Sequence, residues 1–165
     1  MDNYTELKFE FSLDKLTKDM YNVINKSSWG EFNQISLTHM PGDKNWFSGI
    51  GFGGLMSTAC TELNSDLYNT HYETLHNQIM KTHPFTRARL MLLKSKECMS
   101  FHSDFTKRIH VPLVTNTNCK MVIDDEVFHM LASDNLAYET NTMKQHTAFN
   151  ANLNFDRIHI LFDLI

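Results

Sequence analysis

The chain has 165 residues, of which 42% are hydrophobic and 21% charged, and its 15 Lys and Arg against 19 Asp and Glu give a net charge of −4. A chain of this length can bury a substantial core, and this composition excludes a disordered acidic tail and a coiled-coil rod. A nucleic-acid-binding protein usually carries a basic stripe, and none is visible, so we expect no nucleic-acid partner. No run of 18 apolar residues is present and the mean hydropathy is −0.35, so we also expect no membrane partner.

The three cysteines, Cys60, Cys98 and Cys119, are far apart and form no CxxC motif. Such cysteines are typical of reduced thiols. The amino-terminal MDNYTELKFEFS lacks the basic and apolar regions of a signal peptide. We therefore expect a cytoplasmic protein, and the sequence leaves its oligomeric state open.

The first half of the chain is expected to mix strands and helices. Residues Lys8–Ser12 are predicted to form a short strand, after which Ser12 can cap a helix, and Gln34–Met40 alternates as a second strand. A second helix is expected to end before Pro84. The apolar residues at helical spacing are Leu13, Leu16, Met20, Val23 and Ile24 in the first helix and Tyr68, Tyr72, Leu75 and Ile79 in the second.

From Arg87 onward the hydrophobic period changes to two, which predicts strands joined by short polar turns. Eight short strands in this space favour a double-sheet jelly roll. No glycine is available for the turns, so we expect left-handed backbone at Asn116, Asn118, Asn135 and Asn152. The eight runs are Arg87–Lys94, Cys98–Ser103, Lys107–Val114, Cys119–Asp124, Glu126–Ala132, Leu136–Thr140, Gln145–Asn150 and Asp156–Leu164.

The stretch Gly49–Gly54 matches GxGxxG, the fingerprint of dinucleotide-binding folds. That fingerprint requires a buried strand immediately before it, within a βαβ unit. The preceding residues, DKNWFS, make a poor buried strand. The stretch is therefore predicted to be a mobile loop, which could act as a lid over a site.

The segment SFHSDF places His102 and Asp104 two residues apart, so in a strand they project to the same side. Two imidazoles and one carboxylate form the facial triad of non-haem Fe(II) oxygenases. His146, at the start of a late strand, is the best candidate for the second imidazole. The HxD motif alone is a weak signal and is more often a surface pair.

Two predicted strands carry polar residues on one face and apolar residues on the other. Arg108 and His110 share a face in one, and Arg157 and His159 share a face in the other. Unpaired buried charges are costly, so such faces usually line a ligand site. An arginine near a metal suits a dicarboxylate cosubstrate, which chelates with one end and pairs bidentately with the other.

Arg87 and Arg89 also share a face. The favoured interpretation is a strand-edge ion pair, and the alternative is that one of them binds a substrate carboxylate. Asp163, near the end of the chain, is expected to make a structural contact.

The segment RARLMLLKSKECMSFHSDFTKRIHVPLVTN, followed by H-x10-R-I-H-I-L-F-D, resembles the aspartyl/asparaginyl β-hydroxylase family, most closely the branch of small proline hydroxylases. The resemblance implies a mainly β fold with flanking helices, a double-stranded β-helix (jelly roll, cupin-like) with an N-terminal α/β support segment. Residues 1–165 are expected to form a single domain, with 1–85 as support and possible lid and 86–165 as the core.

The resemblance further implies an Fe(II)- and 2-oxoglutarate-dependent dioxygenase that uses O2 to hydroxylate an amino acid or a peptidyl residue, of proline or Asp/Asn type, with release of succinate and CO2. The alternative is a non-catalytic cupin-like module that binds a metal or a small acid. The implied iron ligands are His102, Asp104 and His146, with Arg157 on the distal carboxylate of 2-oxoglutarate and Arg108 and His110 near the cosubstrate or substrate carboxylate.

Met91 departs from the family pattern, because some members have a polar cosubstrate contact there. The short first half leaves no room for a separate peptide-capturing domain. We therefore expect a small amino acid or a short exposed peptide segment as the substrate.

Overall fold

The computed structural model describes residues 2–30, 32–50 and 60–165, so most of the predicted Gly49–Gly54 loop lies outside the described residues. The helices are α1 (Leu13–Ser27) and α2 (His71–Thr82), with a 3-10 turn at Ser65–Leu67. The strands are β1 (Tyr4–Lys8), β2 (Gln34–Ser36), β3 (Thr38–His39), β4 (Glu62–Leu63), β5 (Phe85–Leu93), β6 (Arg108–Val114), β7 (Cys119–Ile123), β8 (Glu126–Phe128), β9 (Leu136–Thr140), β10 (His146–Asn150) and β11 (Arg157–Leu164).

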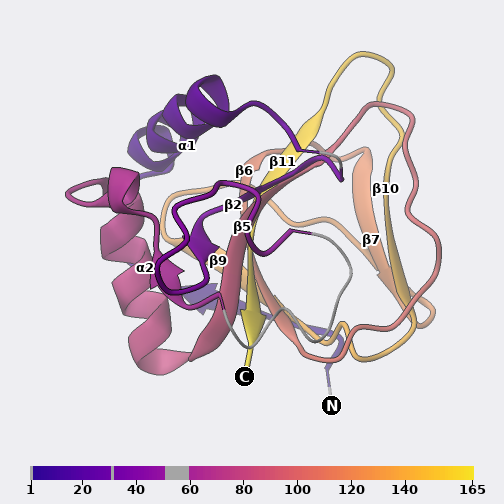
Figure 1. Ribbon diagram of the computed structural model, residues 1–165. Coiled ribbons are helices and arrows are strands. Elements are labelled where there is room, and N and C mark those ends of the chain that lie inside the picture. The colour runs from indigo at the N-terminus through magenta and orange to yellow at the C-terminus, as the bar shows by residue number, and fades with distance from the viewer. Residues whose placement is uncertain (1, 31, 51–59) are drawn as a thin grey trace.

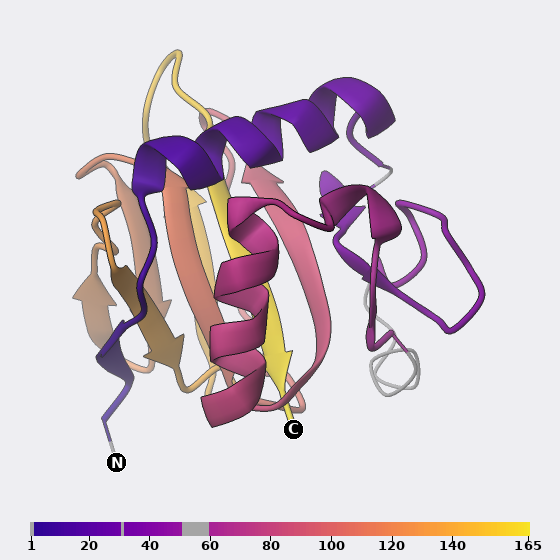
Figure 2. The same cartoon turned by 90° about the vertical axis from the view of Figure 1, so that its left-hand side faces the viewer.

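Two antiparallel sheets face each other. The larger has the strand order β1-β9-β6-β11-β5-β2, and the smaller has the order β10-β7-β8. Both helices lie on the outer face of the larger sheet, and β7 and β10 lie on its other side (Figure 1). Figure 2 shows α1 and α2 crossing that outer face. This arrangement confirms the predicted mainly β, double-stranded β-helix fold with flanking helices.

Apolar and polar side chains alternate along β11, and this alternation explains how the fold places polar groups inside the barrel. Ile158, Ile160 and Phe162 belong to the main hydrophobic core, together with the apolar stripes of the helices. Because successive side chains point to opposite faces, Arg157, His159 and Asp163 point between the two sheets. The interior of the barrel therefore carries polar groups, as the period-two patterns of the sequence indicated.

Seven of the eight predicted strand runs from Arg87 onward correspond to β5–β11, although β8 is shorter than Glu126–Ala132. The prediction of a strand at Cys98–Ser103 is wrong. This segment makes only two isolated bridges to β10, Cys98↔Phe149 and His102↔His146. From Cys98 to His102 the chain advances by four residues, whereas from His146 to Phe149 it advances by three. The segment therefore has one extra residue relative to β10, and an extra residue of this kind interrupts the hydrogen-bond ladder between two strands.

The prediction of a strand at Lys8–Ser12 is also wrong, because pairing with β9 runs from Tyr4 to Lys8. The chain then turns away, and the Phe11 N–H donates to Oδ1 of Asn135 at 2.8 Å. The single strand predicted at Gln34–Met40 is two short strands in different sheets, since β2 pairs with β5 whereas β3 pairs with β4. Tyr68 lies before α2 rather than within it.

Of the four asparagines expected in left-handed backbone, only Asn135 adopts it, with a φ of 61°. The predictions for Asn116, Asn118 and Asn152 are wrong. Asn116 instead accepts a hydrogen bond from the Asn118 N–H at 2.9 Å through its side-chain oxygen. This Asx turn reverses the chain without a positive φ. Asp124 takes the left-handed position between β7 and β8, with a φ of 52°.

The start of α1 yields a prediction about stability. Ser12 is the N-cap residue, but its side chain makes no capping hydrogen bond. Instead, Oδ1 of Asp134 accepts a hydrogen bond from the Leu13 N–H at 2.6 Å. We expect Asp134→Ala to lower the free energy of unfolding by about 1 kcal/mol, which is typical for loss of a cap, and Ser12→Ala to have little effect. Urea denaturation of the two variants measures this difference, and an equal loss in both would contradict it.

No helix in the described ranges combines the length and hydrophobicity needed to cross a lipid bilayer.

Candidate active site

Three potential metal ligands converge at the edge of the smaller sheet. His102 and Asp104 lie on the segment after β5, and His146 begins β10. One ligand atom from each residue lies within 4.8 Å of the others. Nε2 of His146 is 3.2 Å from Oδ2 of Asp104, and Nε2 of His102 is 3.8 Å from Oδ1. The bridge between His102 and His146 holds the two backbones side by side, which explains why ligands so distant in sequence meet.

Backbone carbonyls orient both imidazoles. Nδ1 of His102 donates to the carbonyl of Ser100 at 2.8 Å, and Nδ1 of His146 donates to that of Lys144 at 2.9 Å. Since a carbonyl can only accept, Nδ1 is the donor in each of these hydrogen bonds, and each ring turns its Nε2 toward Asp104. Metal-binding histidines usually have such an outer hydrogen bond. Two imidazole nitrogens and a carboxylate that face one another make a ligand set suited to a metal cation.

Arg108 joins this triad to a second charged cluster. Its Nη1 lies 2.6 Å from Oδ2 of Asp104, and its Nε donates to Oδ1 of Asp163 at 2.9 Å. Burial opposes ionisation of Asp104, but the His146 hydrogen bond and the Arg108 charge together outweigh it and lower the pKa of this carboxyl. Asp104 is therefore held as a carboxylate, the form that can ligate a metal.

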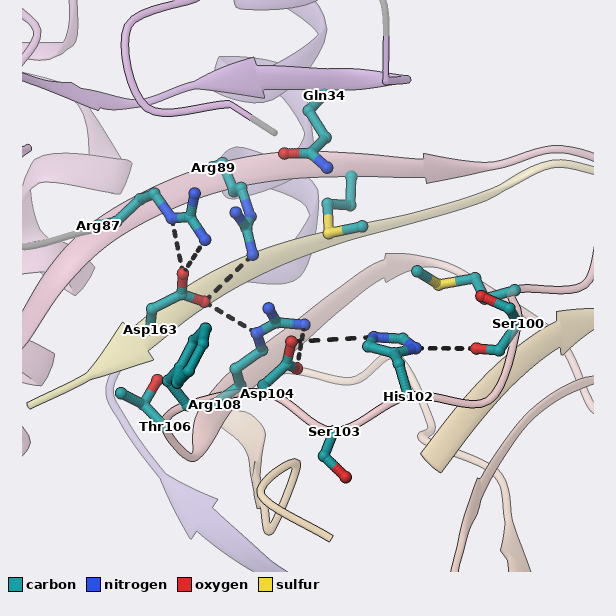
Figure 3. A pocket seen from close by; sticks show the side chains of 13 residues that line it. Gln34, Arg87, Arg89, Ser100, His102, Ser103, Asp104, Thr106, Arg108 and Asp163 are labelled. Atoms are coloured by element: carbon teal, nitrogen blue, oxygen red, sulfur yellow. Dashed lines mark hydrogen bonds and ion pairs between the residues drawn. The ribbon is translucent and has the colours of Figure 1, made fainter. Parts of the chain in front are cut away.

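Asp163 is the centre of the second cluster, as Figure 3 shows. Nε of Arg87 donates to it at 2.6 Å, and Nη2 of Arg89 donates at 3.2 Å. The ion pair predicted for Arg87 and Arg89 is confirmed, as is the structural contact of Asp163, although the pair lies inside the barrel rather than at a strand edge. Burial lowers the pKa of Arg89 to about 9, against the opposing effect of Asp163, so Arg89 remains charged near neutral pH.

A buried row of polar groups lies on the same inner face. Nδ1 of His110 is 3.4 Å from Nδ1 of His159, and burial lowers the pKa of both rings well below its usual value. Burial also lowers the pKa of Arg157 to about 10. Within the described part of the chain, Nε of Arg157 and Nε2 of both histidines have no hydrogen-bond partner. Such groups are costly when left unsatisfied, so this region is suited to a polar ligand.

A cavity of about 440 Å³ opens beside the triad. His102 and Asp104 form part of one wall, and Arg87, Arg89 and Arg108 form part of another. A smaller cavity of about 230 Å³ reaches Arg157. The two cavities share the lining residues Gln34, Met91 and Met99.

The structure thus brings His102, Asp104 and His146 together and places Arg108 against them, whereas His110 and Arg157 lie deeper in the barrel. The sequence did not identify the central position of Asp163 among three arginines. The alternation of side chains along β11 could have predicted this position, because it puts Asp163 on the same face as Arg157 and His159. Gln34 and Met99 were missed too, since neither lies in a chemical motif.

Comparison with solved structures gives similar folds at low sequence identity. An oxidoreductase of the 2OG-Fe(II) oxygenase family from Burkholderia pseudomallei has a TM-score of 0.61 and 10% identity, over 98% of this chain and 84% of that chain. A viral collagen prolyl hydroxylase from Paramecium Bursaria Chlorella virus-1, in a 2OG complex, has a TM-score of 0.55 and 9% identity, over 99% and 95% of the two chains. A nickel complex of the non-heme monooxygenase ThoJ has a TM-score of 0.58 and 9% identity, over 99% and 74%.

The chain also matches smaller cupin structures over about half of its own length. It spans 66% of a cupin superfamily protein from Desulfitobacterium hafniense and 51% of a cupin 2 domain-containing protein from Halorhodospira halophila. No curated protein matches the chain significantly. The sequence pattern described as aspartyl/asparaginyl beta-hydroxylase matches residues 12–165. The chain therefore belongs to the aspartyl/asparaginyl β-hydroxylase family.

Proposed function

We propose that the protein is an Fe(II)- and 2-oxoglutarate-dependent hydroxylase of an amino acid or a peptidyl residue. The observation that carries this proposal is the convergence of His102, Asp104 and His146 with both Nε2 atoms turned inward. When bound, Fe(II) and 2-oxoglutarate supply an oxidant that transfers one oxygen atom of O2 to a C–H bond and the other to succinate, with release of CO2. The residues of the chain hold these groups and exclude water.

His102, Asp104 and His146 would hold the iron through three ligand atoms on one side. A facial set of two imidazoles and one carboxylate leaves the remaining positions of an octahedral ion for the cosubstrate and O2. The outer hydrogen bonds of the two rings orient the Nε2 atoms toward Asp104, and Arg108 contacts Asp104 through an ion pair. These contacts reduce the reorganisation that metal binding would otherwise require.

Arg157 would bind the distal carboxylate of 2-oxoglutarate. It is 3% exposed, and its unsatisfied Nε favours an anionic ligand. Because a guanidinium can bind a carboxylate bidentately, Arg157→Met is expected to weaken 2-oxoglutarate binding at least about 100-fold while leaving Fe(II) binding largely intact. Isothermal titration with Fe(II) and with 2-oxoglutarate, performed separately, measures the two effects. An unchanged affinity for 2-oxoglutarate would reject this role of Arg157.

His110 and His159 would complete the cosubstrate pocket as neutral imidazoles. Their Nδ1 atoms lie within 3.4 Å of each other, so one ring donates to the other and each keeps Nε2 available for a further hydrogen bond. A neutral ring suits this position because the nearby Arg157 already supplies the positive charge that a dicarboxylate needs.

The substrate would enter the larger cavity. Among the described residues that line it, three arginines face two carboxylates, Asp163 and Asp104, so the cavity favours a substrate that carries a carboxylate or an amide oxygen. Free amino acids such as proline and residues of Asp, Asn or Pro type in a peptide all meet this requirement.

The test is an assay of succinate and CO2 formation with Fe(II), ascorbate and O2. Free amino acids and pools of short peptides are supplied in separate reactions. Substrate-dependent succinate that disappears in the His102→Ala variant would support the proposal. A folded, iron-loaded protein that forms no succinate with or without any substrate would contradict it.

We also propose that residues 1–165 act as one domain in a reducing, cytoplasmic environment. Support for one domain comes from β1 and β2, which pair with β9 and β5 and so extend the larger sheet from the first half of the chain. Support for a reducing environment comes from Cys98 and Cys119, which form no disulfide within the described part of the chain.

A further inference from the structure

Cys98 is the exposed cysteine of the chain, whereas Cys60 and Cys119 are buried. It lies on the segment between β5 and the metal ligands, and it lines the cavity of about 230 Å³ that reaches Arg157. A cysteine reacts through its thiolate, and only where a reagent can reach the sulfur. Cys98 is therefore the cysteine of this protein that is open to modification.

Contacts with β10 hold Cys98 in place at the cavity. The N–H of the next residue, Met99, donates to the Ala148 carbonyl at 2.9 Å. The Cys98 Sγ itself lies 3.3 Å from the Met99 carbonyl oxygen and 3.8 Å from Oγ1 of Thr147. The thiol is thus both accessible and fixed against the strand that begins with the metal ligand His146.

Arg157 lines the same cavity and is 3% exposed. Its Nε has no hydrogen-bond partner among the described residues. Burial lowers the pKa of Arg157 to about 10, so its guanidinium remains charged near neutral pH. Glu97 lines the cavity too, but its Oε2 already accepts a hydrogen bond from the Lys94 N–H at 2.8 Å. A buried guanidinium with an unsatisfied donor favours an anionic ligand.

A small disulfide that carries a carboxylate matches both the thiol and the guanidinium. The Cys98 thiol loses its proton to solvent, its thiolate attacks one sulfur of the disulfide, and a new S–S bond forms as the original S–S bond breaks. The electron pair of the broken bond leaves with the second sulfur as a thiolate, so Cys98 is oxidised and half of the reagent is reduced. The carboxylate of the attached half then shares the cavity with Arg157, which can bind it bidentately.

We propose that Cys98 is a site of reversible thiolation by small disulfides that carry a carboxylate, with the attached group in the cavity and its carboxylate on Arg157. Neutral and cationic disulfides lack this partner and react more slowly. Thiolation also excludes 2-oxoglutarate, because both ligands need Arg157. This consequence rests on the proposed function, whereas the thiolation itself does not.

The test uses metal-free protein and three disulfides of similar size. Each half ends in a carboxylate in dithiodipropionate, in a hydroxyl in hydroxyethyl disulfide and in an ammonium group in cystamine. Each rate constant is divided by that for N-acetylcysteine amide, which corrects for the intrinsic reactivity of the reagent. We expect dithiodipropionate to react at least about tenfold faster than hydroxyethyl disulfide on this scale, and cystamine to react most slowly, because a positively charged cleft accelerates the association of anions by about that factor or more. Mass spectrometry measures the rates, and peptide mapping identifies the modified residue.

Arg157→Met is expected to remove the preference for dithiodipropionate and to leave the rate with hydroxyethyl disulfide unchanged. The matched control is Lys96→Met, because Lys96 is exposed and carries the same charge two residues before Cys98. This control is expected to keep the full preference. Cys98→Ser is expected to lose the modification by all three reagents. Circular dichroism verifies that the variants fold.

Two results would overturn the inference. One is an equal corrected rate for dithiodipropionate and hydroxyethyl disulfide, or modification of Cys60 or Cys119 in place of Cys98. The other is a preference that persists in folded Arg157→Met or disappears equally in Lys96→Met, which would assign it to the general charge of the surface.

The effect on 2-oxoglutarate is measured on protein that has been thiolated with dithiodipropionate and loaded anaerobically with Fe(II). We expect its affinity for 2-oxoglutarate to fall at least about tenfold, because Arg157 is then occupied, and to recover when dithiothreitol releases the attached group. An undiminished affinity would show that the attached group does not reach Arg157. Failure of the proposed function is recognised separately, because the unmodified protein would then bind no 2-oxoglutarate while the preference in thiolation remained.

Discussion

The His146→Ala variant is expected to lose Fe(II) binding and all iron-dependent turnover while retaining its fold. Nε2 of His146 lies 3.2 Å from Asp104, and His102, Asp104 and His146 form the one such group of potential metal ligands among the described residues. Loss of an outer contact to a metal ligand typically costs 10–100-fold in affinity or activity, so loss of the ligand itself should exceed about 100-fold. Equilibrium titration with Fe(II) under argon measures the affinity.

The matched control for this prediction is His71→Ala. The side chain of His71 is 52% exposed on α2 and lies 3.5 Å from Asp19, and α2 covers the face of the larger sheet opposite to β10 (Figure 1). This variant should bind Fe(II) as the unmodified protein does. Circular dichroism checks that both variants keep the β-rich fold. If folded His146→Ala bound Fe(II) with undiminished affinity, His146 would not be a ligand.

The Asp163→Asn substitution is expected to lower the free energy of unfolding by about 3–5 kcal/mol, more than the other single substitutions proposed for this protein. Asp163 is 3% exposed and contacts Arg87, Arg89 and Arg108. Removal of its charge leaves three guanidiniums close together inside the barrel, with Asp104 as the remaining nearby carboxylate. Urea denaturation at neutral pH measures the loss.

A surface ion pair provides the control for this prediction. Lys107 and Glu139 are 2.7 Å apart, but both side chains are partly exposed, at 35% and 22%. Exposed pairs contribute about 0–1 kcal/mol, so Glu139→Gln should have a far smaller effect than Asp163→Asn. Similar losses in the two variants would show that the buried cluster has no special importance.

Acid should act on the same cluster. Burial disfavours the charged form of Asp163, but the three arginines outweigh burial and lower its pKa from 3.8 to about 2. Because the folded-state pKa is lowered, this stabilisation is complete above the ordinary carboxyl pKa and is lost as the pH falls from about 4 to about 2. Stability measured across this range should fall more steeply in the unmodified protein than in Asp163→Asn.

The sequence predicted the elements in which one face is apolar and the other polar. β6 and β11 were identified by their period-two pattern, because one face of each packs against α1 and α2 and the other faces the barrel interior. The same pattern was misleading at Cys98–Ser103, where an extra residue breaks the pairing with β10. Hydrophobic period alone contains no information about such a register shift.

Contacts between segments far apart in the sequence could not be predicted for a related reason. Asp134 caps α1 by accepting a hydrogen bond from the Leu13 N–H, and Asn135 accepts one from the Phe11 N–H, so both contacts depend on how the start of α1 packs against the turn before β9. Ser12 was the natural candidate by its position, but local position does not determine which side chain reaches the exposed N–H groups. For the site, the HxD motif and the later histidine predicted the group formed by His102, Asp104 and His146.

The most direct test of the account is anaerobic titration of the metal-free protein with Fe(II) and 2-oxoglutarate, monitored by visible absorption. A metal-to-cosubstrate charge-transfer band should appear only when both are present. It should be absent in His146→Ala and should require much more 2-oxoglutarate in Arg157→Met. If the well-folded protein gave no band at saturating concentrations of both, the proposed oxygenase site would be contradicted, and a cupin-like module that binds a metal or small acid without catalysis would explain the structure better.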